Sequence, residues 1–235
     1  MRGCLFVLLL GVALLAGLAW FGSGPLANAA IGAALGGSGF HAASSTISAT
    51  ADPPPRLLLG HADRVSVTGS DVDWRALHAD RLSLTLDGVD LLSRTAYSIR
   101  GSIDGASLDD GNGGTARASS IKFAGRADAA DTTVVVTPAA VRDAILSAAA
   151  QRFGIHISDV RIAPPNRLQL VTSLATLEGR MTIDGNGALA LDTRLGAIPI
   201  LTIDTSLPLR LDSVAVINGE LHLSGTLDAE ALLRG

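Results

Sequence analysis

The 235-residue sequence has very little cysteine, lysine or aromatic material. Its one cysteine, Cys4, excludes an intramolecular disulfide, and it precedes an apolar run, whereas a lipoprotein cysteine follows one. Aromatic residues make up 3%, which leaves few flat rings for stacking sugars or bases. Lys122 is the only lysine and the formal net charge is -4, so the sequence offers no clustered basic surface for a phosphate backbone. Nucleic acid is therefore excluded as a partner.

Catalytic and metal-binding patterns are missing as well. The five histidines form no H-E-x-x-H pair, and no cysteine is placed to join them as a ligand. Asp71-x-Asp73 is only a fragment of a calcium loop. Ser119-x-x-Lys122 has the spacing of a nucleophile pair, but on a strand this spacing puts the two side chains on opposite faces. We expect no catalytic residues, no metal and no cofactor.

The N-terminus carries the longest apolar run in the chain. Arg2 is followed by apolar residues 4–21 and then by small residues, the order found in an export signal. Ala27-Asn28-Ala29 fits a cleavage site, yet the run is also about as long as the shortest bilayer span of roughly 17 residues. We expect residues 1–24 to be a signal peptide or a transmembrane anchor, and residues 25–235 to form one exported domain on the periplasmic side of the cytoplasmic membrane.

Most of the remaining sequence alternates between apolar and polar residues, as strands do. Leu82, Leu84 and Leu86 point to one side, and the alternation slips by one residue at Gly88, which predicts a bulge or tight bend. Similar alternation predicts further strands around residues 44–52, 65–74, 96–103, 116–124, 155–160, 168–170, 177–183 and 189–191, the last two joined by a turn at residues 184–187. Asn218-Gly219 between two alternating runs predicts a hairpin.

Helical patterns are few. Residues 25–35 can form a short helix, and Thr137-Pro138 opens a second helix that runs to Phe153, with threonine as the cap and proline in the first turn. Three prolines, Pro53 to Pro55, predict a break or a strand switch. The fold class expected is α+β. It consists of a strongly curved, mainly antiparallel sheet wrapped around one or two helices and preceded by the apolar N-terminal helix.

The small number of helices raises the question of what covers the apolar strand faces. Leaving several faces wet costs many kcal/mol at about 25 cal/mol per Å² of apolar surface. Either the sheet curls on itself or something else fills the gap. A sheet that curls around an apolar ligand would cover these apolar strand faces.

Four segments resemble one family in their content and order: PRLLLGHADRVSVTGSDVDW, LHADRLSLTLDGVDLL, VTPAAVRDAIL and LRLDSVAVINGELHLSG. They are similar to the DUF2993 group of exported bacterial proteins, which is related to the LmeA-type phospholipid-binding proteins of the mycobacterial envelope. The resemblance runs from about Pro25 to Leu227. It implies a tubular lipid-binding (TULIP-like) fold and non-catalytic phospholipid binding. The long apolar N-terminus and the triple proline depart from the family pattern.

The candidate lipid-binding residues are the apolar side chains of the expected strands and of the second helix. They are Leu57, Leu58, Leu59, Val65, Val67, Leu82, Leu84, Leu86, Val141, Ile145, Leu221 and Leu223. The leucines at positions 57–59 are either core at a sheet edge or an exposed tip that enters a bilayer. Arg56 and Arg64 flank them and are the expected phosphate head-group ligands.

The function expected is binding of phospholipid acyl chains in an apolar cavity at the membrane surface, in the maintenance of envelope lipids or glycolipids. A structural or adaptor protein of the envelope with a dry core is the alternative, with its protein partner unknown. A hydrolase whose Ser, His and Asp converge only in the folded chain comes third.

Overall fold

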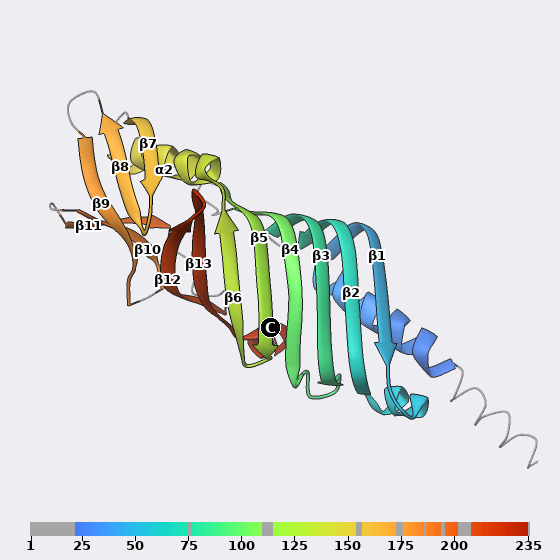
Figure 1. Cartoon of the computed structure of the whole chain (residues 1–235). Helices are drawn as coiled ribbons and strands as arrows, with labels where there is room; N and C mark the ends of the chain where they lie inside the picture. The colour runs from blue at the N-terminus through green and yellow to red at the C-terminus, as the bar shows by residue number, and fades with distance from the viewer. Residues whose placement is uncertain are drawn as a thin grey trace, which may run out of the picture.

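The computed structural model describes residues 22–74, 77–109, 115–153, 157–172, 176–185, 187–193, 196–201 and 208–234. These residues form two antiparallel sheets, one of eight strands and one of five, with few helices (Figure 1). The α+β class and the dominance of antiparallel strands are therefore confirmed.

The larger sheet has the strand order β1-β2-β3-β4-β5-β6-β13-β12. Its first six strands form a meander, and the last two return from the C-terminal part of the chain. The strands are β1 (Phe40–Thr50), β2 (His61–Trp74), β3 (Leu77–Asp90), β4 (Ser98–Asp109), β5 (Thr115–Arg126), β6 (Ala129–Val136), β12 (Leu209–Ile217) and β13 (Glu220–Leu227). Between β1 and β2 the proline segment forms a 3₁₀ helix, η1 (Pro54–Leu59), so the expected break is confirmed.

The smaller sheet has the strand order β11-β10-β9-β8-β7. Its strands are β7 (Ile157–Ala163), β8 (Arg167–Thr172), β9 (Thr176–Ile183), β10 (Leu189–Thr193) and β11 (Gly196–Leu201). The helix α2 (Pro138–Phe153) leads into this sheet from β6. Its expected start is confirmed, because the Thr137 side-chain oxygen accepts a hydrogen bond from the backbone N–H of Ala140 at 3.3 Å.

Local sequence signals explain the turns and bulges. Gly88 has φ 61°, and the backbone N–H of Tyr97 donates to its carbonyl oxygen at 3.2 Å, so the slip in the leucine pattern is a tight bend. Asn218 and Gly219 both have positive φ angles, as the two central residues of a type I′ turn require. Because this turn matches the twist of its flanking strands, β12 and β13 pair from Ile217 opposite Glu220 onward.

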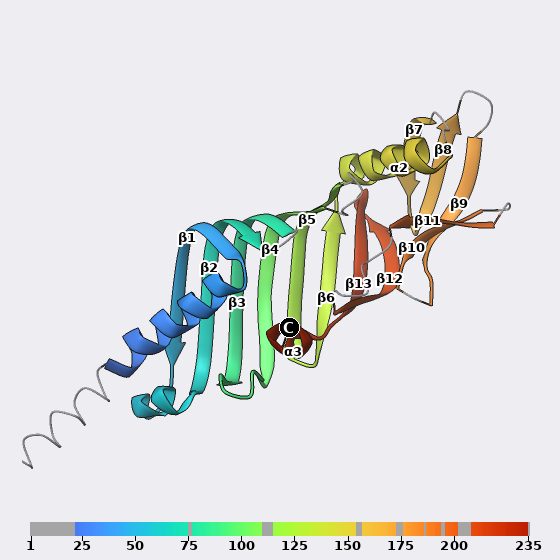
Figure 2. The same ribbon diagram turned by 180° about the vertical axis from the view of Figure 1, so that it is seen from behind.

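The helix of residues 22–37 and the short helix α3 (Ala229–Arg234) lie against the same face of the larger sheet (Figure 2). The strands bend over the N-terminal helix, but the sheet is neither closed nor strongly curled. The expected strongly curved sheet wrapped around a helix, and with it the tubular form, is therefore wrong. The physical reason is that other elements cover the apolar face: the N-terminal helix at one end and the second sheet at the other.

The buried side chains form two hydrophobic clusters. Cluster 1 joins the N-terminal helix, β2–β5 and α3, and includes Ala27, Val65, Val67 and Phe123. Cluster 2 joins the second sheet and α2 to β6, β12 and β13. In it lie the following fully buried side chains: Leu168, Met181, Leu191, Leu221 and Leu223.

The expected signal or anchor, including its apolar run over residues 4–21, lies outside the described residues. The described part of the N-terminal helix runs without interruption across the expected domain boundary between Gly24 and Pro25. Among the described residues, no helix is both long and apolar enough to cross a membrane.

Candidate functional site

The face of the larger sheet that bears the helices carries apolar residues in rows that run from strand to strand. In one row the register places Leu82 of β3 beside Ile103 of β4, which is followed by Ile121 of β5 and Val134 of β6. In the next row Leu84 of β3 pairs with Val67 and with a glycine of β4. Side chains that are direct cross-strand neighbours touch, so each row is a continuous apolar track.

The middle of these rows is incompletely covered. Leu82, Leu84, Ile103 and Ile121 are partly exposed, and we call these four residues the inner strip. Leu82 belongs to neither cluster, whereas Ile121 packs against both. The strip therefore lies where the cover from the N-terminal helix ends and the cover from the second sheet begins.

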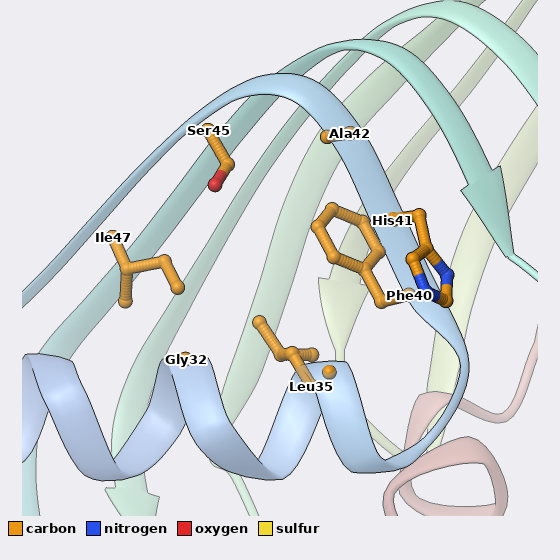
Figure 3. A pocket seen from close by; sticks show the side chains of 8 residues that line it. Gly32, Leu35, Phe40, His41, Ala42, Ser45 and Ile47 are labelled. Atoms are coloured by element: carbon orange, nitrogen blue, oxygen red, sulfur yellow. The ribbon is translucent and has the colours of Figure 1, made fainter.

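A hollow of about 310 Å³ lies between the N-terminal helix and β1 (Figure 3). The residues that line it are Gly32, Leu35, Gly36, Phe40, His41, Ala42, Ser45 and Ile47. Ser45 pairs with Gly69, which pairs with Leu82, and Ile47 pairs with Val67, which pairs with Leu84. The hollow thus lies at the β1 end of the same rows that contain the inner strip.

The hollow is lined by both apolar and polar groups. His41, on the right in Figure 3, forms a 3.1 Å hydrogen bond between its Nδ1 and the carbonyl oxygen of Gly39, and Ser45, at the upper left, adds a hydroxyl. Two glycines of the helix, Gly32 and Gly36, present no side chain to the hollow, which leaves the space between helix and strand open.

A second hollow, of about 560 Å³, lies where α2 meets β7. Its lining includes the charged side chains of Arg142 and Asp143 together with Leu146 and Val160. The α2 residues expected to contact lipid, Val141 and Ile145, are instead buried in cluster 2. This hollow therefore shares no lining residue with the expected site.

The twelve expected lipid-binding residues fall into four groups. In cluster 1 the structure buries Leu57, Val65, Val67 and Leu86, and in cluster 2 it buries Val141, Ile145, Leu221 and Leu223. Only Leu82 and Leu84 belong to the inner strip. Leu57 is buried, as the core interpretation expects, whereas Leu58 and Leu59 beside it are exposed, and their entry into a bilayer stays a prediction.

The two expected head-group arginines do not lie with the inner strip. Arg56 is on η1, where its Nη1 lies 3.3 Å from an oxygen of Asp63. Arg64 precedes the inward-facing Val65 and points to the opposite face of the sheet, where its Nε donates to Asp87 at 2.8 Å. Arg100 donates to the same carboxylate at 3.0 Å. The hydrogen bond from Arg64, assisted by that from Arg100, holds the pKa of Asp87 below its ordinary value.

Two residues of the strip, Ile103 and Ile121, were not among the expected site residues. The signal that identifies them is weak, because small residues separate the apolar positions of β4 (SIRGSIDGASLD) and β5 (TARASSIKFAGR). The alternation of Ile99, Gly101 and Ile103 becomes recognisable as one face once Gly101 is counted as an inward position.

In the described part of the chain, no group of three or more His, Cys, Asp or Glu side chains is arranged to hold a metal ion. Comparisons of the chain with protein-family models, with curated proteins and with solved structures gave no match. The resemblance to the DUF2993 group therefore stays a prediction.

Proposed function

We propose that the protein is a non-catalytic lipid-binding protein of the cell envelope that holds an acyl chain along the inner strip. The observation that carries this proposal is the partly exposed row of aliphatic side chains between two closed clusters. On the same face Val67 and Leu223 are buried, whereas Ile47 and Val136 are partly exposed, as the strip residues are. A row of apolar side chains that the protein's own elements leave partly open favours an apolar ligand.

The dimensions of the row suit an acyl chain. Neighbouring strands lie about 4.8 Å apart, so the path from Ser45 on β1 to Ile121 on β5 crosses four steps and spans roughly 19 Å. This length is comparable to that of an extended fatty acyl chain. Burial of methylene groups contributes about 0.8 kcal/mol each, without any demand on chain identity, so we expect a broad preference among lipids.

The polar end of such a ligand is best placed at the hollow beside β1. His41 and Ser45 supply hydrogen-bonding groups there, whereas no polar side chain belongs to the inner strip. The proposed ligand class is therefore a phospholipid or related lipid, with the head group at the β1 edge. Export to the periplasmic side of the cytoplasmic membrane, kinship with the DUF2993 group and a role in envelope lipid maintenance belong to this same proposal.

An adaptor function is the second candidate, and the edge strand β1 favours it. The sequence of β1, FHAASSTISAT, contains no lysine, arginine, acid or proline, the residues that usually protect an edge from pairing. Its outer side has no strand partner among the described elements. One of its backbone donors is occupied, because Asn28 Oδ1 accepts a hydrogen bond from the N–H of Ala49 at 2.7 Å.

Native mass spectrometry of the full chain, released from a non-ionic detergent after exposure to phosphatidylglycerol vesicles, tests the proposal. We expect retained phospholipid in the unchanged chain and its loss in Leu84→Asp, which puts a charge into the inner strip. Ser83→Asp is the matched control, since Ser83 is the exposed neighbour on the opposite face of the same strand. Both variants keep the apolar N-terminal run, so lipid held by that run cancels in the comparison.

Equal lipid retention in Leu84→Asp and Ser83→Asp, with the strand signal in circular dichroism intact, would refute the inner strip as the binding site. A lipid-free mass for the unchanged chain would do the same and would move the adaptor function to first place. Pairing through β1 then predicts a complex that Ser45→Pro disrupts.

A further inference from the structure

The exposed large apolar side chains are concentrated at one end of the larger sheet. In the described residues Leu58, Leu59, Leu92 and Tyr97 are exposed by 50%, 65%, 79% and 77%. All four come from η1 or from the segment between β3 and β4, which lie at the same end of the sheet (Figure 1). We call these four residues the apolar rim.

Hydrogen bonds hold the two segments of the rim together. The backbone N–H of Leu91 donates to the carbonyl oxygen of Gly60 at 2.8 Å, which ties the β3–β4 turn to the end of η1. The carboxylate of Asp90 accepts hydrogen bonds from the backbone N–H groups of Leu92 and Ser93 at 2.9 and 3.0 Å. These bonds, that of Ser93 first, hold the pKa of Asp90 below its ordinary value. The exposure of Leu92 is thus built into an ordered turn.

The N-terminal helix reaches the sheet at the same end. The hydrogen bond from Ala49 to Asn28 places this part of the helix beside the last residues of β1, immediately before η1. Leu26, one residue before the buried Ala27, is 62% exposed there. The described N-terminal helix therefore begins at the end of the molecule that carries the apolar rim, and in the sequence the apolar run of residues 4–21 precedes it.

Both signs of charge occur around the rim. Arg56 on η1 lies 3.3 Å from an oxygen of Asp63, and Arg126 at the end of β5 bonds to Asp128 at 2.8 Å. Arg94 lies in the β3–β4 turn with an exposed side chain, so the rim includes a cation for a lipid phosphate.

We propose that the apolar rim inserts into the surface of a lipid bilayer. Leu58, Leu59, Leu92 and Tyr97 enter the boundary between head groups and acyl chains, and Arg94 contacts a lipid phosphate. The sheet then stands on the membrane at this end, with the Asn218-Gly219 hairpin facing away. That the bilayer supplies the lipid bound at the inner strip rests on the proposed function. The insertion of the rim itself is tested separately.

The test uses the full chain with Cys4→Ser, reconstituted in vesicles of phosphatidylcholine with a minority of phosphatidylglycerol. A polarity-sensitive fluorophore is attached through Leu92→Cys or, in a second variant, through Leu59→Cys. Ile217→Cys is the matched control, because Ile217 is also an exposed apolar residue, at 47%, and adjoins the hairpin at the far end of the sheet. All three positions are exposed, so labelling leaves the core intact.

We expect blue-shifted emission at positions 92 and 59, and about twofold stronger quenching by nitroxide-labelled lipid than at position 217, since a rim residue lies ~5–10 Å into the lipid boundary. Water-like emission at both rim positions would overturn the proposal. A blue shift that needs no vesicles and grows with protein concentration would also overturn it and assign the rim to a second copy of the chain. If the rim stays exposed to water but native mass spectra still show retained phospholipid, rim insertion is refuted while lipid binding at the inner strip stands.

Discussion

Leucines of the inner strip are less enclosed by other elements than leucines of cluster 2. A leucine-to-alanine substitution in each place measures this difference as a loss of stability. Leu84 and Leu223 lie on the same face of the larger sheet, but Leu84 is partly exposed and Leu223 is 2% exposed. Shortening Leu223 to alanine removes buried contacts and leaves a cavity, which costs about 2–5 kcal/mol. Shortening Leu84 leaves no closed cavity, and the partial loss of apolar burial costs about 1 kcal/mol.

Thermal unfolding followed by circular dichroism and native mass spectrometry check the two variants in parallel. One kcal/mol shifts the Tm of a domain of this size by roughly 2–4 °C, so we expect Leu223→Ala to lower the Tm by on the order of 10 °C and Leu84→Ala by only a few degrees. Lipid retention well below the Tm should show the reverse order, with the loss in Leu84→Ala. Equal shifts in Tm would show that Leu84 is as enclosed as Leu223, and the argument for an open strip would fail.

Two further predictions concern ion pairs on the sheet. We expect Asp87→Asn to lower the free energy of unfolding at pH 7 by at most about 1 kcal/mol, because the bonds from Arg64 and Arg100 are exposed. Because the pKa of Asp87 is lowered in the folded chain, this stabilisation is present above about pH 3.9, the pKa in the unfolded chain, and is lost as the pH falls through the folded pKa. Denaturant unfolding curves of the two proteins should therefore converge in acid. A difference in unfolding free energy that stays constant with pH would contradict this. The 2.7 Å hydrogen bond to Asp73 raises the pKa of His78 in the folded chain. The pair therefore stabilises the fold below about pH 6.5, the histidine pKa in the unfolded chain, and this contribution is lost as the pH rises through the folded pKa. An NMR titration of His78 should shift to lower pH in Asp73→Asn, and an unchanged midpoint would exclude the pair.

Elements with strong local signals were predictable from the sequence. The alternating leucines of β3, the threonine cap of α2 and the Asn218-Gly219 hairpin each depend on residues close together in the chain, and the structure confirms all three. Their stability needs little knowledge of distant partners, because side-chain alternation, capping and turn chemistry act within a few residues.

Two strands were missed, for different reasons. In β6 the inward positions include Ala130 and Thr132, which interrupts the apolar alternation, but the five β-branched residues from Thr132 to Val136 are a local strand signal that was overlooked. In β11 a proline at position 199 weakens the strand pattern, and the structure places β11 at a sheet edge, where proline is tolerated. This strand is hard to recognise without its partner, because β propensity depends on packing against neighbouring strands.

The error about curvature has the same origin. The predicted curvature assumed that only helices cover the apolar face, and two helices are too few for eight to ten strands. The chain instead folds residues 157–201 into a second sheet that packs with α2 over β6, β12 and β13, through contacts between residues far apart in sequence. Since this cover and that of the N-terminal helix are built independently, they need not meet, and the partly exposed Leu82 lies at the junction. The incomplete junction, and not a curled sheet, is therefore the physical basis for an apolar site in this fold.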